Sequence, residues 1–129
     1  MQKYVHEQTA TLLRRLASQA HEAASLGSEE AIHDLRVAIR RLSQCLRVFP
    51  EFFPKDAAKK IRHELREVMD AAGAVRNYDI AIELLKKSKA PAEPALAQER
   101  RRAGKRLESL LNAWRRHDFS QKWRERLIG

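Results

Sequence analysis

Residues 31–49, AIHDLRVAIRRLSQCLRVF, carry two side-chain stripes of opposite character. The apolar stripe has the three- and four-residue spacing of an amphipathic helix and predicts a buried seam. Its members are Ile32, Leu35, Ile39, Leu42, Leu46 and Phe49. The second stripe is displaced by one residue, or about 100° around the helix, and consists of His33, Arg36, Arg40, Ser43 and Arg47. Its ends lie roughly 21 Å apart along the helix axis, which is long enough to follow an extended polyanion.

The same arrangement recurs in the next helical segment, residues 55–75. Its predicted seam is Ala58, Ile61, Leu65, Val68, Ala72 and Val75. The stripe displaced by one residue contains Lys59, Arg62, Arg66, Met69, Gly73 and Arg76. Two basic stripes with the same offset from their seams predict one shared basic surface. The alternative is a solvated face, in which arginines lay their stems on apolar surface and keep their charged heads in water.

Helical periodicity continues through the rest of the chain, with predicted helices at residues 3–25, 96–116 and 119–128. Their predicted inward residues are Val5, Leu12, Leu16, Ala20 and Ala23, then Ala103, Leu107, Leu110 and Trp114, then Trp123 and Leu127. Gly27 ends the first helix and Ser28 caps the second. The third helix is expected to bend between residues 73 and 79, with Asn77 available to cap a separate segment at residues 80–87. Pro91 and Pro94 make residues 88–95 a linker, and no strand pattern is present.

Composition limits the classes of partner. The chain has 129 residues, which suits one domain, and a net charge of +9, which predicts a polyanionic partner. The charge is uneven: residues 33–66 and residues 93–129 each carry +5, whereas residues 67–92 are neutral. The single cysteine, Cys45, and the lack of a long apolar run favour a reducing, cytoplasmic location away from membranes.

Catalytic and metal-binding motifs are weak or missing. The sequence has no glycine-rich phosphate loop, no nucleophile elbow and no paired cysteines. Glu30 and His33 have the Glu-x-x-His spacing of di-iron bundles, but Lys60 stands where the glutamate partner of His63 would be needed. We therefore expect no catalytic residue, no metal site and no cofactor.

The two basic segments resemble the CHAD family, the conserved histidine α-helical domain. His33, Arg36, Arg40 and Arg41 match its His-x-x-Arg-x-x-x-Arg-Arg helix. Its following Gly-x-x-Arg-Asp-x-Asp element corresponds here to Gly73, Arg76, Asn77 and Asp79, and Asn77 departs from the family pattern. The resemblance covers roughly residues 5–116 and implies an all-α fold of two four-helix halves around a basic pore that binds inorganic polyphosphate.

By this resemblance, residues 1–129 form a single half-size domain: a four-helix bundle-like half with a short extra C-terminal helix. A homodimer would then rebuild the full basic surface, and the protein could associate with polyphosphate granules. The residues expected to bind polyphosphate are His33, Arg36, Arg40, Arg41, Arg47, Lys59, Arg62, Arg66, Arg76, Arg102, Lys105 and Arg106. Binding is expected to tighten below about pH 6.5, because a bound phosphate favours protonated imidazole at His33.

Two other functions stay open. A helical nucleic-acid-binding protein would have the same charge, although the basic stripes contain no aromatic residue for base stacking. A non-catalytic scaffold could dock its basic face on an acidic partner or on a granule.

Overall fold

The computed structural model describes residues 1–91 and 93–129, and it is all-helical within those ranges. The α-helices are α1 (Gln2–Leu26), α2 (Glu29–Val48), α3 (Lys55–Lys87), α4 (Pro94–Arg116) and α5 (Phe119–Leu127), with a short 3₁₀ helix, η1 (Pro50–Phe52), between α2 and α3. Ala92, within the predicted linker, lies outside the described residues.

The turn between α1 and α2 forms as its residues predict. Gly27 takes the left-handed conformation at φ 59°, which glycine adopts without a steric penalty, and its N–H donates to the carbonyl of Ala23. The Ser28 hydroxyl accepts a hydrogen bond from the Ala31 N–H at 3.2 Å. Glu29 and Glu30 occupy the first turn of α2, where carboxylates suit the positive end of the helix dipole.

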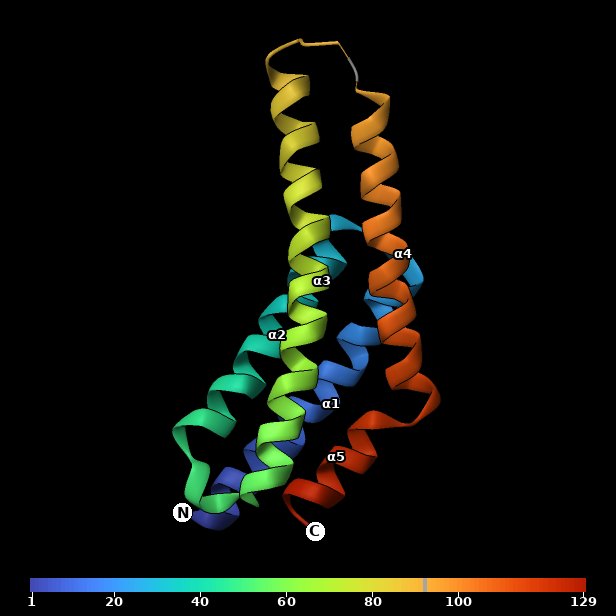
Figure 1. Ribbon diagram of the computed structural model, residues 1–129. Helices are drawn as coiled ribbons and strands as arrows, with labels where there is room; N and C mark the ends of the chain where they lie inside the picture. The colour runs from blue at the N-terminus through green and yellow to red at the C-terminus, as the bar shows by residue number, and fades with distance from the viewer. Residues whose placement is uncertain (92) are drawn as a thin grey trace.

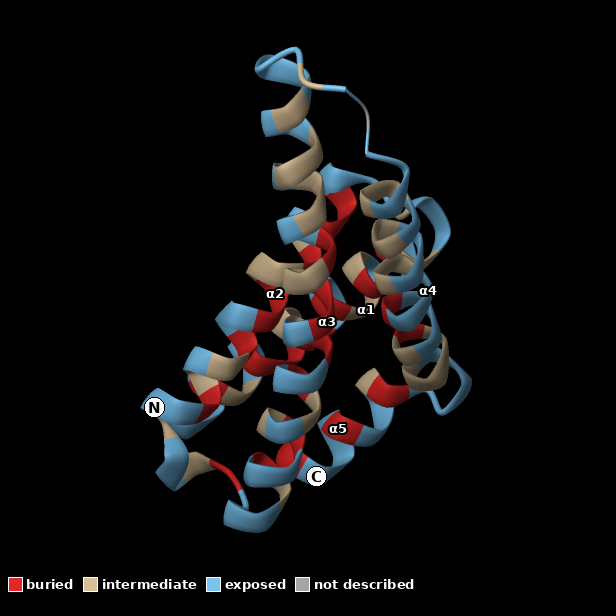
Figure 2. Ribbon diagram, turned by 45° about the horizontal axis from the view of Figure 1, so that its top comes forward, coloured by how far each residue is buried: buried red, intermediate tan, exposed pale blue. Residues whose placement is uncertain are grey.

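Four helices form a closed ring around one core (Figure 1). The neighbouring pairs are α1 with α2, α2 with α3, α3 with α4, and α4 with α1, so α2 and α4 lie at opposite corners, while α5 packs beneath α1 and α3. The predicted seams of α2 and α3 are buried except for Phe49, which is half-buried. Buried residues of all the main helices face the centre of the bundle (Figure 2).

Two seam predictions were partly wrong. In α1, Leu12 is only half-buried, and Leu13 and Ala10 are buried instead. In α4, Leu107 and Leu111 are buried, whereas Leu110 and Trp114 lie at the edge of the core. The buried stripe of each helix follows the position of its neighbours, which a single helix sequence does not contain.

The predicted bend in the third helix was wrong. α3 runs without interruption from Lys55 to Lys87, and Asn77 lies inside it rather than at a cap. One glycine in a helix interior costs only about 1 kcal/mol, and burial of Ala72 and Val75 on either side of Gly73 holds the helix in register. The C-terminal part of α3 and the start of α4 project beyond the rest of the bundle as a helical hairpin (Figure 1).

Candidate polyanion-binding groove

A groove between α2 and α3 is lined by four arginines. Arg40 and Arg47 come from α2, and Arg62 and Arg66 come from α3. The groove has a volume of about 390 Å³, and its remaining lining residues are Ile39, Ser43, Gln44 and Met69. No carboxylate is among these residues, so every ionisable side chain of the groove is an arginine. We call it the arginine groove.

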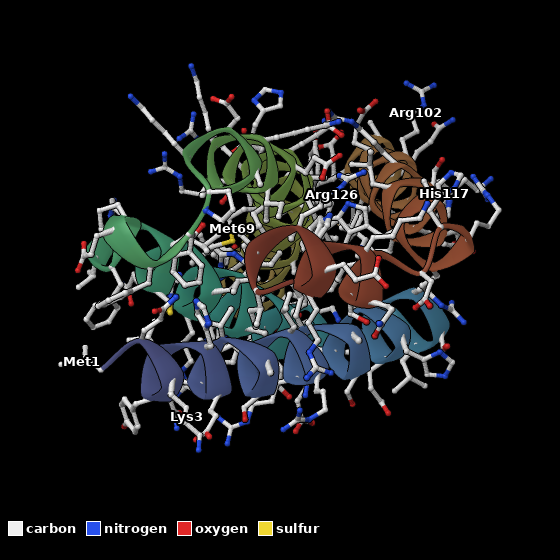
Figure 3. All side chains as sticks on the ribbon, turned by 90° about the horizontal axis from the view of Figure 1, so that it is seen from below. Met1, Lys3, Met69, Arg102, His117 and Arg126 are labelled. Atoms are coloured by element: carbon white, nitrogen blue, oxygen red, sulfur yellow. The ribbon has the colours of Figure 1, made fainter. Side chains whose placement is uncertain are left out.

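Helix periodicity explains why these arginines converge. Each basic stripe lies one residue from a seam that is buried in the same core. Because α2 and α3 also run antiparallel, stripes with the same offset turn toward each other at the junction between the two helices. Met69, on the α3 stripe, lies between α2 and α3 (Figure 3).

Arg36 and Arg76 extend the arginine groove toward the start of α2. Partial burial lowers the pKa of Arg36, and the neighbouring positive charges of Arg76 and Arg40 lower it further. Arg40 thus interacts with Arg36 and also lines the groove. We define the basic strip as Arg36, Arg40, Arg47, Arg62, Arg66 and Arg76.

The basic strip lacks acidic partners within the described ranges. The two ion pairs found there, Arg100 with Asp79 and Arg102 with Glu99, do not involve it. In addition, the Nε–H groups of Arg36 and Arg62 are buried and have no hydrogen-bond acceptor. Buried donors are nearly always satisfied in folded proteins, so these two point to an acceptor supplied by a ligand or by water.

His33 and Lys59 lie on the same two stripes, and both are exposed. His33 precedes Arg36 by three residues on α2, and Lys59 precedes Arg62 by three residues on α3. Because α2 and α3 run antiparallel, the two side chains stand toward opposite ends of the basic strip.

Four of the residues predicted from the sequence lie away from the arginine groove. Arg41 lines a different hollow, of about 300 Å³, between α1 and α2 with Arg15 and Asp34. Arg102 pairs with Glu99 at 3.2 Å and points outward from α4, on the far side of α3 from α2 (Figure 3). Lys105 lines a hollow beside the end of α1, and Arg106 is exposed on α4. Their role in binding stays a prediction.

Sequence reasoning missed two features near the basic strip. Gln44 lines the arginine groove because it follows Arg40 by four residues, a spacing that was available in the sequence. Arg100 was not assigned, yet it forms an ion pair with Asp79 of the family motif. No local signal identified it, since the two residues are 21 positions apart.

Other hollows have mixed charge. One of about 590 Å³, between α1 and α5, combines Lys3, Arg14 and Arg124 with Glu7. Another, of about 310 Å³ among α3, α4 and α5, includes Glu64 and Glu67. Compared with these hollows of mixed charge, the arginine groove is better suited to an anion with several charges.

The chemistry available to the basic strip is recognition of oxyanions. Guanidinium groups present planar N–H pairs that match the oxygen geometry of phosphate or carboxylate, and they stay charged at physiological pH. Among residues 1–91 and 93–129, no helix has both the length and the apolar composition that crossing a bilayer requires.

Comparison with known proteins identifies the family. The family model described as CHAD domain matches residues 8–129, which is nearly the whole chain. No curated protein and no solved structure matches the chain. CHAD domains are generally binding domains rather than catalytic ones. The match over almost the full length, together with the all-helical fold, shows that this chain belongs to the CHAD domain family.

Proposed function

We propose that this chain binds inorganic polyphosphate, or a similar polyphosphorylated anion, through the basic strip, and that it does so without catalysis. The observation that carries the proposal is the arginine groove, in which four arginines from two helices surround one hollow without a carboxylate. The CHAD family is associated in general with polyphosphate binding or metabolism, which supports phosphate as the anionic group.

The mechanism follows from charge and spacing. Arg40, Arg62 and their neighbours would donate charge-assisted hydrogen bonds to oxygens of successive phosphoryl groups. The buried Nε–H groups of Arg36 and Arg62, which have no acceptor among the described protein residues, would donate to phosphoryl oxygens. Displacing counterions from the polyanion makes affinity fall steeply with salt concentration, as it does for nucleic acids.

A nucleic acid is the second candidate partner, because it also presents a row of phosphates. Single strands are usually held by aromatic side chains stacked on the bases. The aromatic cluster of Trp114, Phe119 and Trp123 instead packs on itself at the junction of α4 and α5, with ring centroids 4.8–5.1 Å apart. The arginine groove contains no aromatic residue, which favours a ligand without bases.

A second copy of the chain is the proposed protein partner. Ile80 and Leu84, on the projecting part of α3, are 44% and 62% exposed and lie four residues apart on one helix face. An isologous contact through this face would place two copies of Arg76, one turn away, near the same interface. Light scattering should give twice the monomer mass, and Leu84→Glu should give the monomer mass. A wild-type monomer that binds polyphosphate tightly would overturn this part of the proposal.

Isothermal titration calorimetry tests the binding proposal directly. Wild type and the double variant Arg36→Ala/Arg40→Ala are titrated with medium-chain polyphosphate and with a DNA duplex at matched phosphate and physiological salt concentrations. A matched control, Arg116→Ala/Arg126→Ala, removes the same charge from exposed positions on α4 and α5. We expect tight polyphosphate binding by wild type and the control, loss of binding in the Arg36/Arg40 variant, and weak binding to DNA.

Two outcomes would contradict the proposal. Equal binding of both polymers, little changed by either double variant, would favour diffuse attraction of nucleic acids. No binding to either polymer would favour the scaffold function, in which an acidic protein is the partner.

A further inference from the structure

Arg100 is half-buried, unlike its exposed neighbours Arg101 and Arg102. Its Nε–H donates to Asp79 Oδ1 at 3.0 Å, and its Nη2 donates to the carbonyl of Gly27 at 3.0 Å. A longer contact of 3.4 Å joins Nη2 to Asp79 Oδ2. The side chains of Arg100 and Asp79 are only 25% and 14% exposed. One guanidinium therefore connects α3, α4 and the end of α1; we call Arg100, Asp79 and the Gly27 carbonyl the clamp.

Gly104 makes room for this guanidinium. A Cβ atom at Gly104 would lie 3.1 Å from Arg100 Nη1, closer than such atoms ordinarily approach. No comparable contact exists at Gly73, the other helix-interior glycine, where a Cβ would meet nothing within 4 Å. The absence of a side chain at Gly104 is thus matched to the position of Arg100.

The clamp lies beside the Arg36 end of the basic strip. Asp79 follows Arg76 by three residues on α3, which places it about one helical turn away. Gly27 immediately precedes Ser28, the N-cap of α2, and Arg36 follows two turns later. The clamp thus fixes the start of α2 relative to α3 at the end where Arg36 and Arg76 approach each other.

Arg100 also determines which cation Asp79 pairs with. Asp79 lies three residues from Arg76, a spacing at which side chains on a helix can meet, and a pair between them would remove a cation from the basic strip. Arg100 donates to both oxygens of Asp79 instead, and Arg76 forms no ion pair with an acidic residue within residues 1–91 and 93–129.

We propose that Arg100 and Asp79 are positioning residues for polyanion binding: they set the spacing of the Arg36 end of the basic strip and keep Arg76 available, without touching the ligand. This inference rests on the proposed function. Removing the negative charge of Asp79 should therefore weaken the binding of a polyanion. Simple electrostatics predicts the opposite, because a protein with one more net positive charge attracts a polyanion more strongly.

The test compares Asp79→Asn with Asp70→Asn, which makes the same charge change at an exposed site on the same helix. Affinity for medium-chain polyphosphate is measured by calorimetry at several salt concentrations and at a temperature at which circular dichroism shows every variant folded. We expect Asp70→Asn to bind as tightly as wild type or more tightly. Asp79→Asn should bind at least about fivefold more weakly and with a smaller salt slope, since fewer phosphates are contacted.

Two further variants separate positioning from charge. Gly104→Ala keeps every charge and requires the Arg100 guanidinium to shift by a few tenths of an ångström, so it should weaken binding less than Arg100→Gln does. Arg100→Gln should weaken binding more than Arg101→Gln, which removes the same charge from an exposed neighbour. If Asp79→Asn follows Asp70→Asn, or if Arg100→Gln binds like Arg101→Gln, the clamp does not position the strip. Failure of wild type to bind polyphosphate overturns the proposed function itself, so the two failures are distinguishable.

Discussion

α3 and α4 are both rich in basic residues, but they arrange them differently. On α3, Arg62 and Arg66 are four residues apart beside the buried seam and meet two arginines of α2. On α4, Arg100, Arg101 and Arg102 are consecutive, so they point in directions about 100° apart. One of them is drawn into the clamp and another pairs with Glu99. The difference teaches that spacing relative to the core, more than the number of arginines, decides whether a basic surface can form.

The largest expected effect is on the free energy of unfolding, when a core leucine beneath α3 or α4 is replaced by alanine. Leu65 of α3 is fully buried, whereas Leu110 of α4 lies at the core edge. Leu65→Ala should lower the free energy of unfolding by about 2–5 kcal/mol, because it opens a cavity. Leu110→Ala should lower the free energy of unfolding by less, because water can fill the space that the side chain leaves at the core edge. Urea denaturation measures both, and equal losses would contradict the assignment of Leu110 to the edge.

Next in size is the effect on ligand affinity. Arg40→Ala/Arg62→Ala removes two arginines of the groove and should weaken polyphosphate binding by at least about 100-fold, since each charge-assisted hydrogen bond contributes about 1.5–3 kcal/mol. Arg102→Ala/Arg106→Ala removes equal charge from α4 and should weaken binding only a few-fold. Calorimetry compares them. Equal losses would extend the binding site to α4, as predicted from the sequence.

The pH dependence of binding tests the role of His33, at the N-terminal end of the α2 stripe. A protonated His33 adds a positive charge beside Arg36, so polyphosphate affinity should rise several-fold as the pH falls from 8 to 5.5. The slope should be reduced in His33→Ala. His63, exposed on α3 outside the basic strip, provides the control substitution His63→Ala, which should keep the wild-type slope. An unchanged slope in His33→Ala would exclude this role.

A smaller effect is expected on the stability of the free protein. Burial and the nearby Arg76 and Arg40 lower the pKa of Arg36, so the fold disfavours its charged form. At neutral pH the guanidinium is charged, and Arg36→Met should therefore stabilise the protein without ligand, by less than about 1 kcal/mol because solvent screens the repulsion. Thermal unfolding without polyanion measures this change. A lower Tm would mean that Arg36 stabilises the free fold.

The smallest effect distinguishes the two helix-interior glycines. Gly73→Ala should stabilise α3 by about 0.5–1 kcal/mol, because alanine has less backbone entropy to lose and meets no atom there. Gly104→Ala in α4 should gain less, because its Cβ crowds Arg100. Equal gains in Tm would show that the Arg100 guanidinium moves aside freely.

Much of the fold could be predicted from local patterns. The seams of α2 and α3 were predicted nearly residue by residue, because their apolar side chains repeat at the helical period and have no polar interruption. The predicted break near Gly73 was wrong, because a local helix-breaking signal was outweighed by burial on both sides of it. In α1 and α4 the weaker seams were shifted, because alanine and leucine on several faces leave the direction of the core to the neighbouring helices.

The candidate site divides in the same way. Spacing alone predicted two basic stripes, each displaced by one residue from a strong apolar seam. In the structure, these stripes bring four arginines around one groove. The family motif added Asp79, but it did not reveal that Asp79 pairs with Arg100. That contact joins helices far apart in the chain.

The sequence by itself determined the helices, the two strong seams and the one-residue offset of the basic stripes, because these depend on residues three or four positions apart. Only the tertiary structure decided which arginines share a surface. Arg41 turned toward α1, Arg102 turned outward from α4, and Arg100 was neutralised by Asp79. The physical reason is that charges act through space, and the distances between them exist only once the helices have packed.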